Sequence, residues 1–303
     1  MRTINMNTIT RLTEAYKKAR IEYIDEKSKY IIFSDCHRGT GSLADEFLKN
    51  ENTYNFALNY YFDNGFTYVE AGDGEELWEY PDFGDIKSAH YDVFKNIKRF
   101  YDDDRFILLY GNHNIYLKKQ DYARKNFYTY FDHYHETEHE FLKGIKPLEA
   151  LVLKVKRTNQ EILVVHGHQG DLFNDQFWHF SMLSLKYFWR FFRAFGIKNP
   201  SSPVKNAYKR HKIEKNYNKW IQTHKKMLIC GHTHRAKYPK NNELPYFNTG
   251  CCVYPSRITG MELFEGKIQL VQWRTVPDHM GVIRIKRDIV QGPGHIEQFD
   301  CGS

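Results

Sequence analysis

Short, continuous runs of apolar residues alternate along the chain with longer segments in which apolar residues recur every three or four positions. The short runs are rich in β-branched residues and are bounded by glycine or polar residues, which is typical of buried strands in parallel or mixed sheets. Residues 46–64 and 85–103 have the spacing of amphipathic helices. This alternation predicts an α/β fold.

Five of the apolar runs end in aspartate, asparagine or histidine. They are KYIIFSDCHRG, FTYVEAGDGEE, RFILLYGNHN, EILVVHGHQGD and KMLICGHTHRA. The first three polar ends lie roughly 40 positions apart, which suits a strand, a crossover helix and the next strand. Right-handed crossovers place the carboxyl ends of parallel strands along one edge of a sheet. We therefore expect these polar residues to meet in one crevice.

The composition suits a single large domain. The chain has 303 residues, 41% hydrophobic and 16% aromatic, and no linker, repeat or low-complexity tract divides it. We interpret residues 1–303 as one domain with a helical insertion at about 173–226. The formal charge of +7 favours anionic partners such as phosphates, nucleic acid or an anionic membrane surface.

The cysteines and the N-terminus favour a cytoplasmic protein. The cysteines are odd in number and lack metal-finger spacing, which indicates reduced thiols. They are Cys36, Cys230, Cys251, Cys252 and Cys301. The N-terminus has no apolar core of a secretory signal, and no run approaches the roughly 18 apolar residues of a membrane span.

Taken singly, an aspartate after a strand is usually a helix cap and a lone histidine is usually a surface residue. Burying all of these groups together without a cation would be costly, so metal ligation explains the set better. Carboxylate, amide and imidazole ligands without a thiolate favour Mn, Fe, Zn or Co. Asp73 has two carboxylate oxygens and can bridge two ions roughly 3.5 to 4 Å apart, the clamp used for in-line displacement at phosphorus.

The five motifs, in this order, resemble those of the calcineurin-like metallophosphoesterase superfamily, over about Lys29 to Ala236. The resemblance implies a four-layer α/β/β/α sandwich of two mixed sheets flanked by helices. It also implies hydrolysis of a phosphate ester or pyrophosphate bond by a hydroxide that bridges two metal ions, Mn first among the candidates. The implied ligands are Asp35, His37, Asp73 and His234 for one ion and Asp73, Asn112, His166 and His232 for the other.

The same resemblance implies that His113, Asn112 and Asp73 are the catalytic residues. His113 would be the proton donor or charge stabiliser at the leaving oxygen. The family usually has an acid after Gly-Asn-His, but this chain has Asn114. An amide can hold the ring of His113 but cannot stabilise its cationic form as a carboxylate would. Glu76 occupies a position where the pattern has an acid, and we expect it to orient a ligand.

Two further residues are candidates for substrate binding. Arg38 lies in a Gly- and Thr-containing loop that could present donors to a phosphate, although a surface turn explains it equally well. His168 could contact a substrate, replace His166 as a ligand, or cap a turn. Cys36 is expected to point away from the metals and to be a small buried thiol.

The insertion has two unlike halves. Residues 177–195 form an aromatic helix that either packs on the protein or in a dimer, or serves as a lid for a lipid or nucleobase or as a peripheral membrane contact. Residues 205–226 form a basic helix, which is either a solvated face or a holder of a second phosphate. A helical lid here resembles the branch that contains UDP-2,3-diacylglucosamine pyrophosphatases. We therefore expect a phosphorylated small-molecule or lipid-linked substrate.

Two alternatives remain. The first is a nuclease that grips a strand with the basic helix, although nucleic acid is not an expected partner because no binding motif is visible. The second is a non-catalytic scaffold of the same fold. Beyond His234 the chain reads as β-rich and is expected to complete the second sheet and its C-terminal edge, with strands at 246–248, 260–264, 268–273 and 282–285.

Overall fold

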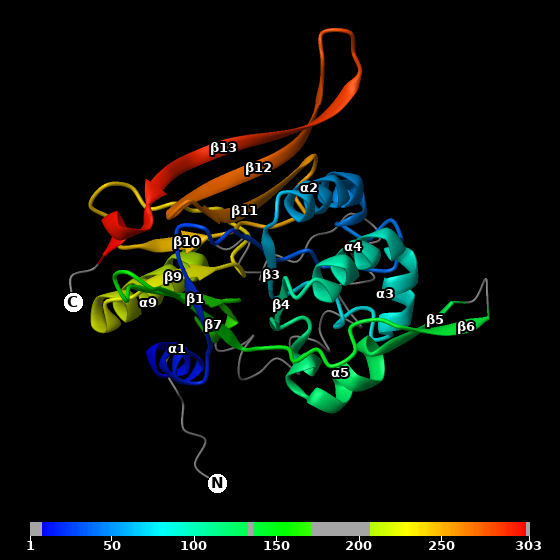
Figure 1. The fold of residues 1–303 in the computed structure, drawn as a ribbon, viewed down its shortest axis with the longest axis horizontal. Helices are drawn as coiled ribbons and strands as arrows, with labels where there is room; N and C mark the ends of the chain where they lie inside the picture. Colours follow the sequence, from blue (N-terminus) through cyan, green and yellow to red (C-terminus); the bar gives the residue numbers. More distant parts are fainter. Residues whose placement is uncertain (1–7, 133–135, 171–206, 301–303) are drawn as a thin grey trace.

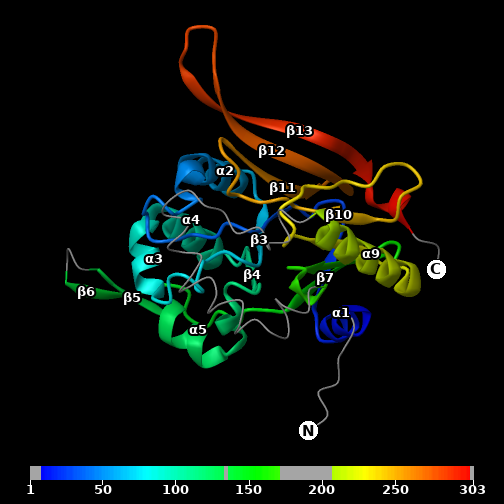
Figure 2. The same cartoon turned by 180° about the vertical axis from the view of Figure 1, so that it is seen from behind.

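The computed structural model describes residues 8–132, 136–170 and 207–300 (Figures 1 and 2). The aromatic helix predicted at 177–195 lies outside these described residues, and so does most of the proposed insertion. Within the described part of the chain, no helix is both long enough and apolar enough to cross a bilayer.

A six-stranded mixed sheet carries the first three predicted strands. Its strand order is β13-β12-β11-β2-β3-β4, with β2, β3 and β4 mutually parallel and the other pairs antiparallel. The bounds are β2 Tyr30–Phe33, β3 Thr67–Ala71, β4 Phe106–Leu109, β11 Arg257–Phe264, β12 Lys267–Pro277 and β13 Ile283–His295. The strands predicted at 260–264, 268–273 and 282–285 are present as β11, β12 and β13, but they extend the sheet of β2, β3 and β4 and supply its edge instead of completing the second sheet.

The other two predicted strands lie in a second, five-stranded mixed sheet. Its order is β1-β7-β8-β9-β10, with only the β7–β8 pair antiparallel. The bounds are β1 Arg20–Ile24, β7 Ala150–Val155, β8 Glu161–Val165, β9 Met227–Cys230 and β10 Tyr246–Asn248. A separate small hairpin pairs β5 Thr129–Asp132 with β6 Thr137–Glu140.

The two sheets pack face to face, with helices outside both. One buried cluster joins their inner faces, with Val69 and Met261 from one sheet and Val164 and Ile229 from the other. The outer face of the six-stranded sheet is covered by α2 Glu51–Asp63, α3 Phe83–Ala89, α4 Tyr91–Asp102 and α5 Gln120–Phe127. The outer face of the five-stranded sheet is covered by α1 Thr8–Lys17 and α9 Ala207–His224. The predicted four-layer sandwich is confirmed.

The helix predicted at 85–103 is two helices, α3 and α4, which meet at His90. His90 is fully buried. Its Nε2 lies 2.8 Å from Asp45 Oδ2 and its Nδ1 lies 3.3 Å from Glu51 Oε2. The helix predicted at 46–64 begins at Glu51, after a short 3₁₀ turn over Leu48–Asn50. The buried His90 side chain therefore links the junction of α3 and α4 to Asp45 and to Glu51, the first residue of α2.

The His90 contacts give a pH-dependent stability. Burial alone would lower the pKa of His90, but the neighbouring carboxylates of Asp45 and Glu51 raise it above 6.5. Burial would raise the pKa of Asp45, but His90 and the backbone amides of Gly41 and Phe47 lower it below 3.8. The His90 contribution is full below the unfolded pKa of 6.5 and is lost as pH rises through the folded pKa. The Asp45 contribution is present above 3.8 and is lost as pH falls through the folded pKa.

We therefore expect His90→Gln to destabilise the protein by about 2 kcal/mol near pH 5.5, with a smaller difference near pH 9. Urea unfolding of both proteins at the two pH values measures this. Titrations elsewhere in the molecule cancel in the comparison of the two differences. An effect of His90→Gln that is equal at both pH values, or larger at the higher one, would contradict the assignment.

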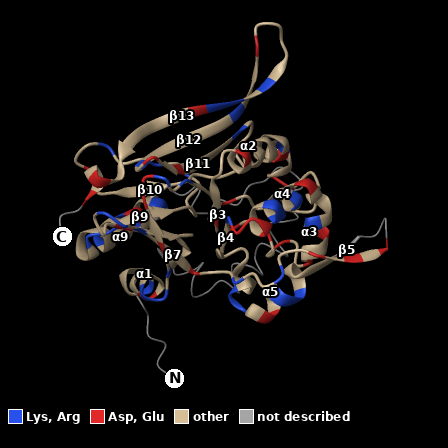
Figure 3. Ribbon diagram, viewed as in Figure 1, with Lys and Arg blue, Asp and Glu red and all other residues tan. Residues whose placement is uncertain are grey.

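Helix α9 separates an apolar face from a basic one. Its apolar face is buried against the five-stranded sheet, and this face consists of Ile213, Tyr217, Trp220 and Ile221. Lys212, Lys215 and Lys219 are exposed on the other face, and Figure 3 shows the basic positions of α9 in blue. The basic helix is thus present where it was predicted, and these lysines lie on a solvated face.

Candidate active site

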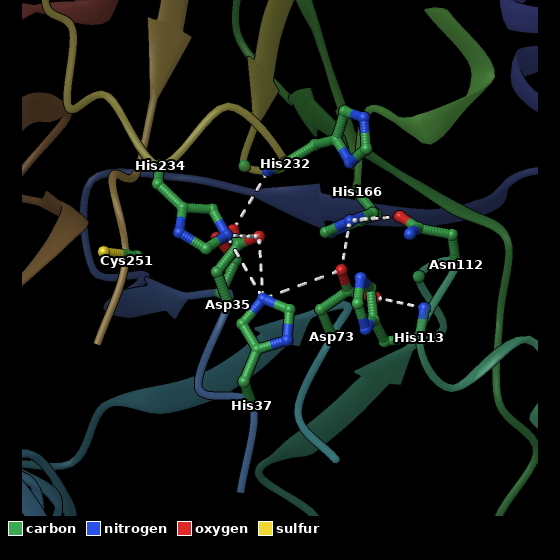
Figure 4. A network of polar contacts seen from close by, with 12 residues as sticks. Asp35, His37, Asp73, Asn112, His113, His166, His232, His234 and Cys251 are labelled. Carbon is green, nitrogen blue, oxygen red and sulfur yellow. Dashed lines mark hydrogen bonds and ion pairs between the residues drawn. The ribbon is translucent and has the colours of Figure 1, made fainter. Parts of the chain in front are cut away.

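The ends of five strands from both sheets bring the predicted site residues together (Figure 4). They follow β2, β3 and β4 of the six-stranded sheet and β8 and β9 of the five-stranded sheet. The residues are Asp35, His37, Asp73, Asn112, His113, His166, His232 and His234. Segments far apart in sequence meet because the carboxyl ends of parallel strands share an edge.

Asp35, His37 and His234 form the first cluster. His234 Nε2 lies 3.1 Å from Asp35 Oδ1. His37 Nε2 lies 3.1 Å from His234 Nε2 and 3.8 Å from Asp35 Oδ1. Two imidazole nitrogens and a carboxylate oxygen therefore point at one small volume.

The second cluster contains Asp73, His166 and His232, with Asn112 beside them. His166 Nε2 lies 3.0 Å from Asp73 Oδ2 and 3.2 Å from Asn112 Oδ1. The same Asp73 Oδ2 lies 3.9 Å from His37 Nε2 of the first cluster. The Asp73 carboxylate therefore stands between the two clusters, which is the place of a bridging ligand.

The hydrogen bonds of the imidazoles show that a cation fits here. His166 Nδ1 lies 3.1 Å from the carbonyl oxygen of Ala71, so Nδ1 is the donor in the neutral ring. His37 Nδ1 lies 3.0 Å from Glu76 Oε2 and is likewise the donor. The Nε2 lone pairs of both rings then face other lone pairs, on oxygen or on His234. Nitrogen and oxygen donors arranged in this way fit Mn, Fe, Zn or Co.

Protonated imidazole rings fit this arrangement less well than a bound metal ion does. Burial alone would lower the pKa values of His37, His166 and His234, but the facing carboxylates raise all three, that of His234 to about 10. Protonated His37 and His234 would place two like charges at Nε2 atoms only 3.1 Å apart. A divalent ion removes this conflict and competes with protons for the same nitrogens.

His113 stands outside both clusters and is held by Glu76. Its Nδ1 lies 2.8 Å from Glu76 Oε1, and its ring stacks on Trp78 with centroids 4.2 Å apart. Burial would raise the pKa of Glu76, but His113 and His37 hold it well below its usual range. Glu76 therefore supplies the carboxylate that is absent at position 114, where this chain has asparagine. Asn114 instead accepts from the amide of Gly111 and donates to Glu75.

Arg38, a candidate for substrate binding, lies inside the protein and not in a surface turn. Arg38 is fully buried and donates to Glu70 and Glu75 rather than pointing into a solvent-facing loop. Burial would lower the pKa of Arg38, but these two carboxylates raise it well above its usual range. The guanidinium is thus committed to internal partners.

His168, the other candidate for substrate binding, is also buried inside the protein. It is 1% exposed, with its ring 5.6 Å from that of His166 and 6.4 Å from that of Tyr110. Burial and the neighbouring histidines hold its pKa well below the usual range, so the ring is neutral. This burial fits packing of the His168 ring against His166. Cys36 is a fully buried core thiol, as predicted.

Several neighbours of the site were not identified from the sequence. Ser34 contacts Asp35 Oδ2 and lies 2.6 Å from the hydroxyl of Thr249. The side chain of Cys251 hydrogen-bonds His234. Thr249 and Cys251 follow a sixth short run, Tyr246–Asn248, which ends in asparagine, and Ser34 immediately precedes Asp35 in the first run.

The backbone at the site is unusual. Five of the candidate ligands have left-handed φ angles, namely Asp35 (53°), His37 (47°), Asp73 (52°), His232 (64°) and His234 (55°). The loops also approach one another closely, since a Cβ on Gly111 would lie 2.1 Å from Asp73 Oδ1. Such conformations persist only where surrounding contacts hold them.

Comparison with known proteins adds little to this geometry. No protein-family model matches the chain, and no curated protein matches it. Among solved structures, a predicted phosphoesterase of Streptococcus pneumoniae is 12% identical, with a TM-score of 0.36 over 86% of this chain and 97% of the other. Vps29 of Chaetomium thermophilum is 8% identical, with a TM-score of 0.39 over 88% and 96%.

A 5'-nucleotidase of Candida albicans is 10% identical, with a TM-score of 0.28 over 89% of this chain and 50% of the other. Likenesses this distant fix neither fold nor function. Both rest on the chain's own topology and side chains.

Proposed function

We propose that this protein is a metal-dependent phosphoesterase of the calcineurin-like kind, which hydrolyses a phosphate ester or pyrophosphate bond. The observation that carries the proposal is the position of Asp73, whose Oδ2 lies between His166 Nε2 at 3.0 Å and His37 Nε2 at 3.9 Å. A carboxylate between two sets of nitrogen ligands is the arrangement expected for a pair of ions.

The residues divide the work as follows. Asp35, His37 and His234 would hold one ion, and Asn112, His166 and His232 the other, with Asp73 shared. When bound, two divalent ions would lower the pKa of a water and stabilise the charge that develops in an in-line displacement at phosphorus.

His113 belongs to neither ligand set. Its Nδ1 is held by the Glu76 carboxylate, which fixes the orientation of the ring. The Nε2 of His113 is then the nitrogen that would donate a proton to the leaving oxygen. Orientation by Glu76 and stacking on Trp78 hold this ring without help from residue 114.

We further propose manganese as the first candidate metal and a phosphorylated small-molecule or lipid-linked compound as the substrate. Excess positive charge supports an anionic substrate in general but does not select one. A cytoplasmic location is part of the same proposal.

The test is hydrolysis by protein stripped with a chelator and reloaded with Mn, Fe, Co or Zn. We expect activity on at least one of p-nitrophenyl phosphate, bis-p-nitrophenyl phosphate or pyrophosphate. We also expect loss of at least about 100-fold on chelation and recovery on reloading, because the ligands themselves provide no nucleophile. Protein never exposed to chelator is the control. Inactivity with every metal and all three phosphate classes would overturn the proposal.

A further inference from the structure

A fully buried polar network lies beside the candidate metal ligands without belonging to either cluster. Arg38 Nη1 donates to Glu70 Oε2 at 2.9 Å, and Nη2 donates to Glu70 Oε1 at 2.6 Å and Glu75 Oε1 at 2.8 Å. Asn114 Nδ2 donates to Glu75 Oε2 at 2.9 Å. All four side chains are 0 or 1% exposed. The metal chemistry proposed above assigns no task to this network.

The network joins the three segments that follow β2, β3 and β4. Arg38 directly follows His37, Glu75 lies two positions after Asp73, and Asn114 lies two positions after Asn112. The backbone reinforces the first junction, since the amide of Arg38 donates to Gly74 O at 2.9 Å and the amide of Glu76 donates to Arg38 O at 3.0 Å. Arg38, Glu75 and Asn114 thus each lie within two positions of a candidate ligand.

The packing around these groups leaves little room for rearrangement. A Cβ on Gly74 would lie 2.1 Å from Glu70 Oε1 and 2.5 Å from Arg38 Nη2. The guanidinium carbon of Arg38 lies 5.1 Å from the ring centroid of Phe94, and Tyr68 donates to Glu70 Oε2 at 2.6 Å. The guanidinium of Arg38 is planar and contacted on several sides. It therefore fixes the relative positions of its partners better than a flexible lysine ammonium would.

We propose that Arg38, Glu75 and Asn114 are positioning residues that set the mutual placement of the three ligand-bearing segments, and through it the affinity for metal and the alignment of His113. This inference rests on the proposed function, because it concerns the same site. Groups that orient metal ligands typically change metal affinity or activity by about 10- to 100-fold when they are replaced.

The direction of the hydrogen bonds supplies a sharp test. Asn114 accepts from the amide of Gly111 and donates to Glu75, so its amide nitrogen is required on the Glu75 side. Asn114→Asp would keep the acceptor but place a carboxylate against that of Glu75. We therefore expect Asn114→Asp, which introduces an acid like that of the resembling family, to impair this protein.

The reciprocal change should repair the damage. Glu75→Gln alone places an amide nitrogen against a donor, because Arg38 donates to one Glu75 oxygen and Asn114 to the other. In the double variant Glu75→Gln with Asn114→Asp, Gln accepts from Arg38 and donates to Asp, and the total charge of the network is unchanged. Only the positions of the carboxylate and the amide are exchanged.

The experiment measures Mn affinity by calorimetry on chelator-stripped protein, kcat and KM on the best substrate, and thermal unfolding. Each single variant should lose about 10- to 100-fold in Mn affinity and in kcat, with KM changed less. The double variant should return to within about threefold of the wild type. Asn96→Asp is the matched control, because Asn96 on α4 hydrogen-bonds Asn55 outside the network, and it should change none of these values.

Single variants within twofold of the wild type, or a double variant no better than either single one, would overturn the inference. If Asn114→Asp fails to fold, Glu75→Gln and the double variant still provide the comparison. Wild-type protein that binds two ions but hydrolyses nothing would contradict the proposed function alone, since the effect on Mn affinity would still be measured. Wild-type protein that binds no ion would overturn both.

Discussion

Asp73→Asn is expected to lower kcat by about 1000-fold, the upper end of what loss of one preorganised electrostatic group costs. Asparagine keeps the shape of aspartate but offers one oxygen and no charge. Asp73 uses both oxygens, since Oδ1 accepts from the amide of His113 at 2.8 Å and Oδ2 faces both clusters. Any orientation of the amide therefore turns its nitrogen toward a donor or toward the ions.

Metal analysis of the purified variant should accompany the kinetics. We expect bound metal to fall below one ion per chain, because both ions depend on the shared carboxylate. Asp102→Asn, which removes an exposed carboxylate paired with Lys98 on α4, is the control and should leave metal content and kcat unchanged. Retention of two ions and more than a tenth of wild-type activity in Asp73→Asn would show that Asp73 does not bridge.

His113→Gln is expected to produce the second large effect, a loss of about 100- to 10,000-fold in kcat for substrates with a poor leaving group. Because His113 belongs to neither proposed ligand set, metal content should be unchanged, even though His113, His37 and Glu76 together form a third group of possible ligands. For p-nitrophenyl esters the loss should be much smaller, since p-nitrophenolate leaves without a proton. The ratio of the two losses therefore separates proton donation from a general disturbance of the site.

Kinetics on a matched pair of alkyl and p-nitrophenyl esters provide this ratio. His139→Gln, which alters an exposed histidine of β6, is the control. Equal losses on both esters would argue against proton donation by His113, and a loss of bound metal would place it among the ligands instead.

The strand ends of the site could be predicted because their pattern is local. An apolar run of four or five residues followed by glycine and a polar group, as at Ala71 and Asp73, has few structural interpretations. The parallel order of β2, β3 and β4 then follows from the lengths of the crossovers. The sequence pattern alone therefore predicts that the candidate ligands meet at one edge.

Arg38 could not be placed in this way because its environment is entirely tertiary. Glu70 lies inside the β3 run and looked like part of a strand, and Phe94 lies on a helix more than fifty positions away. Glycines beside an arginine are common in phosphate-binding loops and in surface turns, so the local signal gave no indication of a buried position. The break at His90 was missed for the same reason, because it depends on the distant Asp45.

The left-handed backbone at five candidate ligands also bears on how such a chain would evolve. Non-glycine residues in this region cost about 1 kcal/mol or more each, and the cost is tolerated where it serves a task. A descendant released from hydrolysis would relieve this backbone strain by replacing His37 or His234 with glycine, whereas Asp35 and Asp73 also accept buried backbone hydrogen bonds. Glycine at these positions would therefore indicate related proteins that keep the fold but no longer catalyse hydrolysis.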